Sequence, residues 1–128
     1  MNVNDTALTR SALVQMAAPD APDRTLFELP LGSGRGQSAA LATSGGHGTR
    51  FGTDPRLHHL LDPATGRSAN HLASVSVAAP RATLADGLST TLSILAPARH
   101  ARLLADYPAV RAWSVDAAGN VTGPGIGA

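Results

Sequence analysis

ASVSVAAPRATLADGLSTTLSIL, residues 73–95, joins a strand pattern directly to a helix pattern. In residues 73–79 apolar side chains recur at every second position, which predicts a strand with one buried face. Pro80 ends this pattern, and leucines then recur at helical spacing, which predicts a helix from about Arg81 to Leu95. We expect the leucine face of this helix to pack on the sheet that contains the strand.

Weaker patterns on both sides extend the sheet. Residues 27–31 suit a half-buried or edge strand, and the glycines of residues 32–36 predict a β-hairpin with residues 38–43. Toward the carboxyl end we expect a strand at residues 59–61 followed by a turn at residues 62–66. A shorter helix is expected at residues 98–106, and residues 110–115 and 121–122 are expected to form a terminal hairpin. The predicted class is α+β, a mostly antiparallel sheet with one main helix and one shorter helix packed on it.

The length of 128 residues fits one domain or part of one. Residues 1–23 are predicted to be a polar segment, with a short helix at about residues 7–16 and a connector at residues 17–23 that Pro19 and Pro22 interrupt. We therefore expect the packed domain to occupy residues 24–128.

Composition excludes several kinds of site. The chain has no cysteine, so disulfides and thiolate ligands are excluded and only oxygen and imidazole ligands remain. The net charge is +1 and the arginines are scattered, which argues against nucleic acid as a partner. No apolar run is long enough for a membrane span, and no secretory signal is visible, so the chain as given is expected to be cytoplasmic.

Asp86 and Thr90 form the first candidate site. They lie four residues apart on the predicted helix, so their side chains share one face, away from the leucines. A carboxylate and a hydroxyl suit Mg²⁺, which keeps water and phosphate oxygens in its shell. The ordinary alternative is the solvated face of an amphipathic helix, and both interpretations stay open. Gly87 favours the site, because a glycine inside a helix often marks the close approach of a ligand or of another backbone.

His59 precedes a turn in which Asp62, Thr65 and Gly66 present polar side chains and amides outward. A histidine at this place suits phosphate binding or general-base catalysis, whereas a structural histidine at a strand edge is the alternative. Upstream, the hydroxyl and amides of Ser44 and Gly45 suit contact with a phosphate. The long polar loop between these segments is expected to border a site. His58 should point the opposite way from His59.

Several motifs in consistent order, from about Asp23 to the end, resemble the carboxyl-terminal half of the ApbE family, the FAD:protein FMN transferases. They are Ala42-Thr43-Ser44-Gly45, His59-Leu60-Leu61-Asp62-Pro63-Ala64-Thr65-Gly66-Arg67, Val75-Ser76-Val77 and Leu84-Ala85-Asp86-Gly87-Leu88-Ser89-Thr90. The resemblance implies that the chain is part of a larger, T-fold-like domain.

The resemblance also implies a reaction and partners. In the family FAD is split at its pyrophosphate, and FMN is attached to a threonine of an acceptor flavoprotein in the presence of Mg²⁺. By that resemblance Asp86 and Thr90 hold the metal, and His59 assists deprotonation of the acceptor. FAD is then expected to meet Ser44, Gly45 and the turn at Asp62, Thr65 and Gly66.

The given sequence contains no counterpart of the family's amino-terminal half, which in the family supplies much of the flavin pocket. The given sequence is then a fragment, a sequence with a mis-assigned start, or a half-protein, which another chain or a homo-oligomer would complete, and these interpretations stay open. Two alternatives remain beside the transferase. One is a catalytically incomplete module that binds a flavin nucleotide or a partner, and the other is an FAD pyrophosphatase in which water replaces the threonine.

Overall fold

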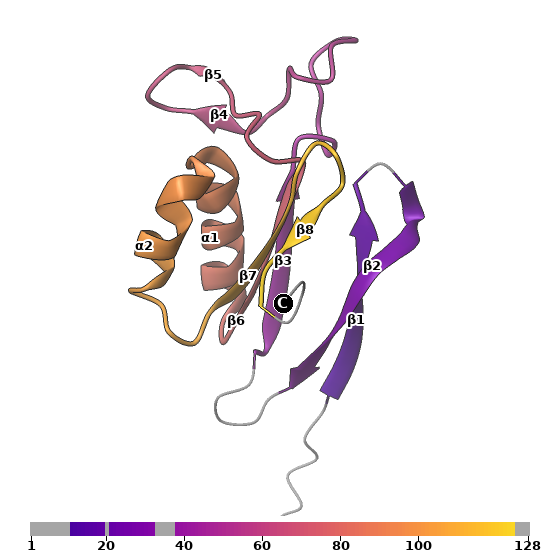
Figure 1. Cartoon of the computed structure of the whole chain (residues 1–128), viewed down its shortest axis with the longest axis vertical. Helices are drawn as coiled ribbons and strands as arrows, with labels where there is room; N and C mark the ends of the chain where they lie inside the picture. Colours follow the sequence, from indigo (N-terminus) through magenta and orange to yellow (C-terminus); the bar gives the residue numbers. More distant parts are fainter. Residues whose placement is uncertain (1–10, 20, 33–37, 125–128) are drawn as a thin grey trace, which may run out of the picture.

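A four-stranded antiparallel sheet forms the middle layer of the protein (Figure 1). The computed structural model describes residues 11–19, 21–32 and 38–124. The strand order is β3-β6-β7-β8, with bounds Ala40–Gly45, Ser74–Ala79, Arg111–Val115 and Val121–Thr122. The predicted α+β class, the strand at residues 73–79 and the terminal hairpin of β7 and β8 are confirmed.

Two helices cover one face of this sheet (Figure 1). Helix α1 (Ala82–Ile94) buries Leu88 and Leu92 against Val75 and Val77 of β6, in one apolar cluster. The short 3-10 helix η1 (Pro97–Arg99) leads into α2 (His100–Leu104), where the shorter helix was predicted. Each buried valine or leucine stabilises the fold by about 1.5–3 kcal/mol relative to an exposed one, so this cluster is the main apolar core.

A second pair of strands covers the opposite face. Strands β1 (Ser11–Ala18) and β2 (Ala21–Gly32) form an antiparallel pair. Leu29 of β2 is buried with Ala78 of β6 and Trp113 of β7, and the rings of Phe27 and Trp113 lie 5.2 Å apart. The central sheet is therefore sandwiched between α1 and the β1–β2 pair.

This pair corrects three predictions. Residues 11–16 are strand rather than helix, and the predicted connector at residues 17–23 contains the end of β1 and the start of β2. The predicted pairing of residues 27–31 with 38–43 is also wrong, because β2 pairs with β1 and β3 pairs with β6. Residues 7–10 and 33–37 lie outside the described part of the chain. The predicted domain start at Arg24 falls inside β2.

Strand β6 is buried on both faces, whereas its alternating pattern predicted one buried face. Val75, Val77 and Ala79 pack toward α1, and Ala78 packs toward β2. The serines between them are buried as well, and Ser76 pairs with Thr43 through their hydroxyl groups at 2.9 Å. The alternating pattern predicts that the small polar side chains of β6 face solvent. It therefore does not predict the β1–β2 layer on that side of the sheet.

The chain between β3 and β6 forms a cap above one end of the sheet (Figure 1). It contains two short paired strands, β4 (Leu61–Asp62) and β5 (Arg67–Ser68), joined by the predicted turn. Gly66 has a φ of +68°, a conformation in which a glycine is favoured. The predicted strand at residues 59–61 is wrong, since regular pairing begins only at Leu61. In the described part of the chain, no helix is long and apolar enough to cross a membrane.

Candidate functional site

A cavity of about 640 Å³ lies where the end of β3, one side of α1 and the cap meet. Its lining mixes polar and apolar side chains, and it gathers five of the eight predicted site residues: Ser44, Gly45, His59, Asp86 and Thr90. The other lining residues are Thr43, His47, Gly48, Thr49, Leu60, Leu61 and Ile94. Segments that are far apart in sequence thus contribute to one site, and the long loop after β3 borders it as predicted.

The α1 side of the cavity carries the oxygen atoms of Asp86 and Thr90. Asp86 is exposed, and in the described residues its carboxylate has no ion-pair or hydrogen-bond partner. Thr90 is half-buried, and its Oγ1 lies 3.2 Å from Oγ of Ser44 on β3. Ser44 Oγ also lies 2.8 Å from Oγ of the fully buried Ser89, which sequence reasoning did not single out.

This donor set fits Mg²⁺. It consists of one unpaired carboxylate and a hydroxyl that line the same cavity, and Mg²⁺ accepts few protein oxygens and retains several waters. In the described residues no three histidine, aspartate or glutamate side chains lie so that they could hold one metal ion together. A zinc site, which takes three or four such ligands, therefore has no counterpart in this part of the chain.

His59 lies on the cap side of the cavity with its ring exposed. Its Nδ1 is 3.2 Å from the carbonyl oxygen of Thr49. Because a carbonyl only accepts hydrogen bonds, Nδ1 carries the hydrogen in the neutral ring, and Nε2 keeps its lone pair. The tautomer is therefore the one that a general base needs at Nε2.

The adjacent His58 is buried whereas His59 is exposed, and their ring centroids lie 6.4 Å apart. That the two rings point in opposite directions stays a prediction. Nδ1 of His58 accepts from the backbone N–H of Leu60 at 3.3 Å, and its Nε2 then donates to Oδ1 of Asn70 at 3.2 Å. The backbone N–H of His58 donates to Oγ of Ser68, whose hydroxyl donates to the His58 carbonyl. His58 thus ties the ends of the cap together beside His59.

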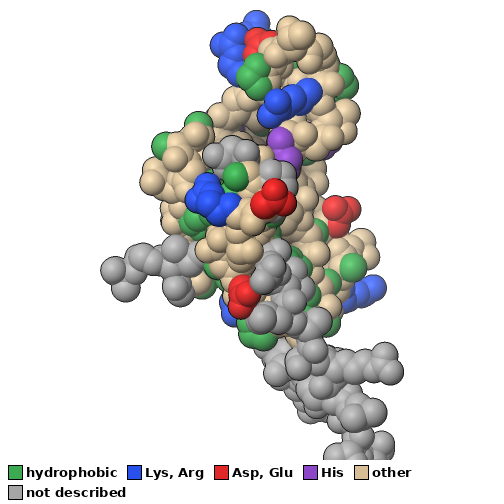
Figure 2. Space-filling model, turned by 90° about the vertical axis from the view of Figure 1, so that its right-hand side faces the viewer, with side chains coloured by type: hydrophobic (Ala, Val, Ile, Leu, Met, Phe, Trp, Pro, Cys, Tyr) green, Lys and Arg blue, Asp and Glu red, His purple; other side chains and the backbone are tan. Residues whose placement is uncertain are grey.

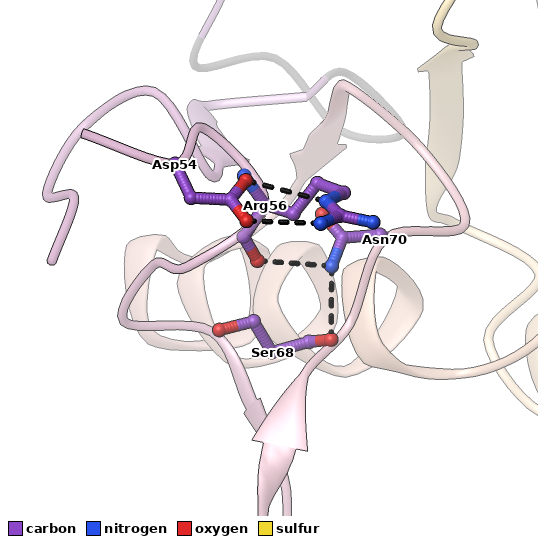
Figure 3. A network of polar contacts seen from close by, with 4 residues as sticks. All are labelled: Asp54, Arg56, Ser68 and Asn70. Carbon is purple, nitrogen blue, oxygen red and sulfur yellow. Dashed lines mark hydrogen bonds and ion pairs between the residues drawn. The ribbon is translucent and has the colours of Figure 1, made fainter. Parts of the chain in front are cut away.

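Asn70 extends this network outward (Figure 3). Its side-chain NH₂ donates to the carbonyl oxygens of Arg56 at 3.0 Å and Ser68 at 3.1 Å. Arg56 in turn pairs with Asp54 at 3.0 Å, and this side-chain hydrogen bond lowers the pKa of Asp54 and raises the pKa of Arg56. Both side chains are exposed, so the ion pair contributes little, and the amide bonds hold the loop.

The turn between β4 and β5 lies outside the cavity lining. Asp62 Oδ1 accepts from the Ala64 N–H at 2.9 Å, and Thr65 Oγ1 accepts from the Arg67 N–H at 3.2 Å. Both side chains therefore stabilise the turn itself. The turn adjoins the cavity through Leu61, which lines it.

Two adjacent glycines at the end of β3 leave no room for a side chain. A Cβ on Gly45, which lines the cavity, would come within 2.9 Å of the Ala73 carbonyl oxygen, and one on Gly46 would collide with the His58 ring. Gly87 differs, since a Cβ there would meet nothing within 4 Å. The prediction that Gly87 marks a close approach is therefore not supported by any contact in the described residues.

The other histidines divide between the cavity and the surface. His47 is exposed but lines the cavity, a role that was not predicted for it. His71 is exposed, and a ring nitrogen of His100 donates to the Leu95 carbonyl at 3.0 Å. On the face shown in Figure 2, basic and acidic side chains are interspersed, in keeping with the absence of a basic patch in the sequence.

Comparison with known proteins gives a consistent result. The model of the ApbE family matches residues 13–114. The FAD:protein FMN transferase of Treponema pallidum (strain Nichols) is 39% identical over 78 residues, which are 59% of this chain and 22% of that protein. The FAD:protein FMN transferase of Escherichia coli (strain K12) is 44% identical over 59 residues, 44% of this chain and 17% of that protein.

Two solved structures have a similar fold. The ApbE protein of Thermotoga maritima superposes with a TM-score of 0.73 and 29% identity, over 88% of this chain and 36% of that one. The flavin transferase ApbE of Vibrio cholerae superposes with a TM-score of 0.59 and 23% identity, over 91% of this chain and 36% of that one. The chain thus spans about a third or less of the length of these relatives.

Proposed function

This chain belongs to the ApbE family, and from that membership we propose that it provides the carboxyl-terminal part of the site of a Mg²⁺-dependent FAD:protein FMN transferase. The observation that supports the proposal is the cavity in which Ser44, Gly45, His59, Asp86 and Thr90 meet. A base with a free lone pair and an unpaired carboxylate face the same space, as phosphoryl transfer to a hydroxyl requires.

In this proposal Asp86 and Thr90 hold Mg²⁺ through their side-chain oxygens. When bound, the ion neutralises negative charge that develops on the pyrophosphate of FAD. His59 accepts the proton of the acceptor threonine at Nε2, while Thr49 holds the ring through Nδ1. A bond forms between the threonine oxygen and the FMN phosphorus, the pyrophosphate bond breaks, and AMP leaves.

The nucleotide is proposed to lie along the β3 end of the cavity. Ser44 and Gly45 form this wall. Asp62, Thr65 and Gly66 would meet the nucleotide at the rim, where Leu61 joins their turn to the cavity. We assign the remainder of the flavin pocket to additional polypeptide: the rest of a longer protein, a separate chain or a second copy of this one.

A pyrophosphatase is the second candidate, because the exposed ring of His59 is accessible to water as well as to a threonine. The two functions differ in the fate of FMN. A transferase leaves FMN on the acceptor protein and releases AMP only when the acceptor is present. A pyrophosphatase releases both FMN and AMP without any acceptor, and a module that only binds releases neither.

The first experiment is calorimetric titration of FAD into the purified chain, with and without Mg²⁺. We expect Mg²⁺-dependent binding that Asp86→Ala abolishes and that the exposed control Asp106→Ala retains. Binding that survives Asp86→Ala would remove this residue from the metal site. No binding by the folded chain would favour a fragment that needs its missing half.

A second experiment tests the base with an acceptor flavoprotein. His59→Ala should slow FMN transfer by about 10²–10⁴-fold, the usual contribution of a general base, and weaken FAD binding far less. Equal losses in rate and binding would make His59 a binding residue instead.

A further inference from the structure

A chain of hydrogen bonds runs from the cavity into the interior of the protein. Thr90 Oγ1 lies 3.2 Å from Ser44 Oγ, and Ser44 Oγ lies 2.8 Å from Ser89 Oγ. The Ser89 hydroxyl donates to the backbone carbonyl of Asp86 at 3.0 Å. The chain of three hydroxyl groups therefore ends at the backbone carbonyl oxygen of Asp86. Asp86 is also the residue whose carboxylate lines the cavity.

The last bond fixes the direction of the other two. A carbonyl oxygen only accepts, so the Ser89 hydrogen is committed to Asp86. Ser89 then accepts from Ser44 and has no second hydrogen to return. Ser44 in turn accepts from Thr90, so the Thr90 hydrogen points toward Ser44 and the remaining lone pairs of the Thr90 oxygen are free.

We propose that Ser89 and Ser44 are positioning residues that orient the Thr90 oxygen as a ligand for a hard divalent cation. The inference rests on the proposed function, in which Thr90 holds Mg²⁺. A hydroxyl binds a cation through its lone pairs, and a hydrogen turned toward the ion opposes binding. Because Ser89 is 0% exposed, water does not compete for its hydrogen and the orientation is set before the ion arrives.

Ser93 provides a matched control on the same helix. It is also buried, and its hydroxyl donates to a helix carbonyl, that of Ser89, at 2.8 Å. It does not belong to the chain of hydroxyls that reaches Thr90. Ser93→Ala therefore removes the same chemical group and the same kind of bond without changing the direction of the Thr90 hydrogen.

The test measures Mn²⁺ alone, without nucleotide, by the loss of the free-ion signal in electron paramagnetic resonance. Mn²⁺ is suitable because, like Mg²⁺, it prefers oxygen ligands. Ser89→Ala should weaken Mn²⁺ binding about tenfold, the lower end of what a hydrogen bond to a charged group contributes. Ser93→Ala should stay within about twofold of the original chain, and Thr90→Val should weaken binding at least as much as Ser89→Ala.

A double substitution distinguishes positioning from simple loss of stability. If Ser89 acts through Thr90, Ser89→Ala has no further effect on Mn²⁺ binding in a Thr90→Val chain. Additive losses in the double variant, or equal binding by Ser89→Ala and Ser93→Ala, would overturn the inference while leaving the proposed function intact. No Mn²⁺ binding by the original chain would refute both the metal site and this inference.

If Ser89→Ala does not fold, Ser44→Ala carries the same test from a half-buried position. It removes the acceptor of the Thr90 hydrogen and should also weaken Mn²⁺ binding about tenfold. Ser44→Thr keeps the hydroxyl and should restore binding. Unchanged binding by Ser44→Ala would refute the proposed orientation of Thr90.

Discussion

Replacing His58 by alanine should loosen the cap without unfolding the sheet. The substitution removes the bonds to Leu60 and Asn70. The Leu60 N–H lies in a buried residue and loses its acceptor, which costs about 1–3 kcal/mol. Asn70 is exposed, so water can replace His58 as the donor to its Oδ1. Only the net contribution of that hydrogen bond to stability is then lost, about 0.5–1.5 kcal/mol. The closed cap is then less stable by about 1.5–4.5 kcal/mol.

Hydrogen exchange measures this loss directly. The informative amides bridge the cap: Phe51 bonds to Leu57, His59 to Thr49 and Ala69 to Leu60. Their exchange should accelerate roughly 10- to 2,000-fold, because each 1.4 kcal/mol of local stability corresponds to a factor of ten. Amides of β6 should change much less, since their bonds lie within the central sheet.

His71→Ala is the control, because His71 is an exposed histidine in the same connection and has no hydrogen-bond or ion-pair partner in the described residues. It should change stability by no more than about 0.5 kcal/mol. If His58→Ala left the exchange of all three cap amides within about threefold of the original rates, the ring bonds would not be what holds the cap. Acceleration in β6 equal to that in the cap would show that the two regions unfold as one unit.

Further predictions concern stability. Leu92→Ala, at a fully buried position of α1, should cost about 2–5 kcal/mol in denaturant unfolding followed by the fluorescence of the single tryptophan, Trp113. Gly45→Ala should destabilise the protein because its Cβ would approach the Ala73 carbonyl, whereas Gly87→Ala should stabilise α1 by about 0.5–1 kcal/mol; the same assay checks both signs. The side-chain hydrogen bond from Asn120 lowers the pKa of Asp116, so its contribution is present above the unfolded pKa of 3.8 and lost as the pH falls through the lower folded pKa. Asp116→Asn should therefore destabilise the protein at pH 7 more than at acidic pH, and an equal effect at both would refute the assignment.

The part of the fold that followed from the sequence is the part with strong local periodicity. Val75 and Val77 alternate in β6, and Leu88 and Leu92 recur at helical spacing in α1, so both elements were predicted within a residue or two. The turn at residues 62–66 was predicted from Pro63 and Gly66, whose backbone preferences are local. Such signals do not depend on what the rest of the chain covers.

The β1–β2 pair was missed because its pattern is not local. Residues 11–16 contain leucine, methionine, alanine and glutamine, which favour helices in isolation, and only pairing with β2 makes them a strand. The same pair packs on Ala78, and the neighbouring Ser74 and Ser76 are buried as well, although sequence patterns assign such small residues to solvent. Tertiary packing overrode intrinsic propensity at both places.

The candidate site shows the same division. Asp86 and Thr90 were found because a helix places residues four apart on one face. Ser89 was not found, since its role depends on contact with Ser44, which is 45 residues away. The structural role of the buried His58 likewise depends on its hydrogen bond to Asn70, a residue that only the folded cap brings close.

The opposite tautomers of the two neighbouring histidines have a spectroscopic consequence. His58 carries its hydrogen on Nε2 and His59 carries its hydrogen on Nδ1. When both imidazole rings are neutral, ¹⁵N NMR should therefore show a different protonated ring nitrogen in each histidine. The His58 signals then report whether the cap is closed, and those of His59 report whether its Nε2 is in contact with a ligand. Folding and ligand contact become separately visible in one labelled sample, before any acceptor protein is in hand.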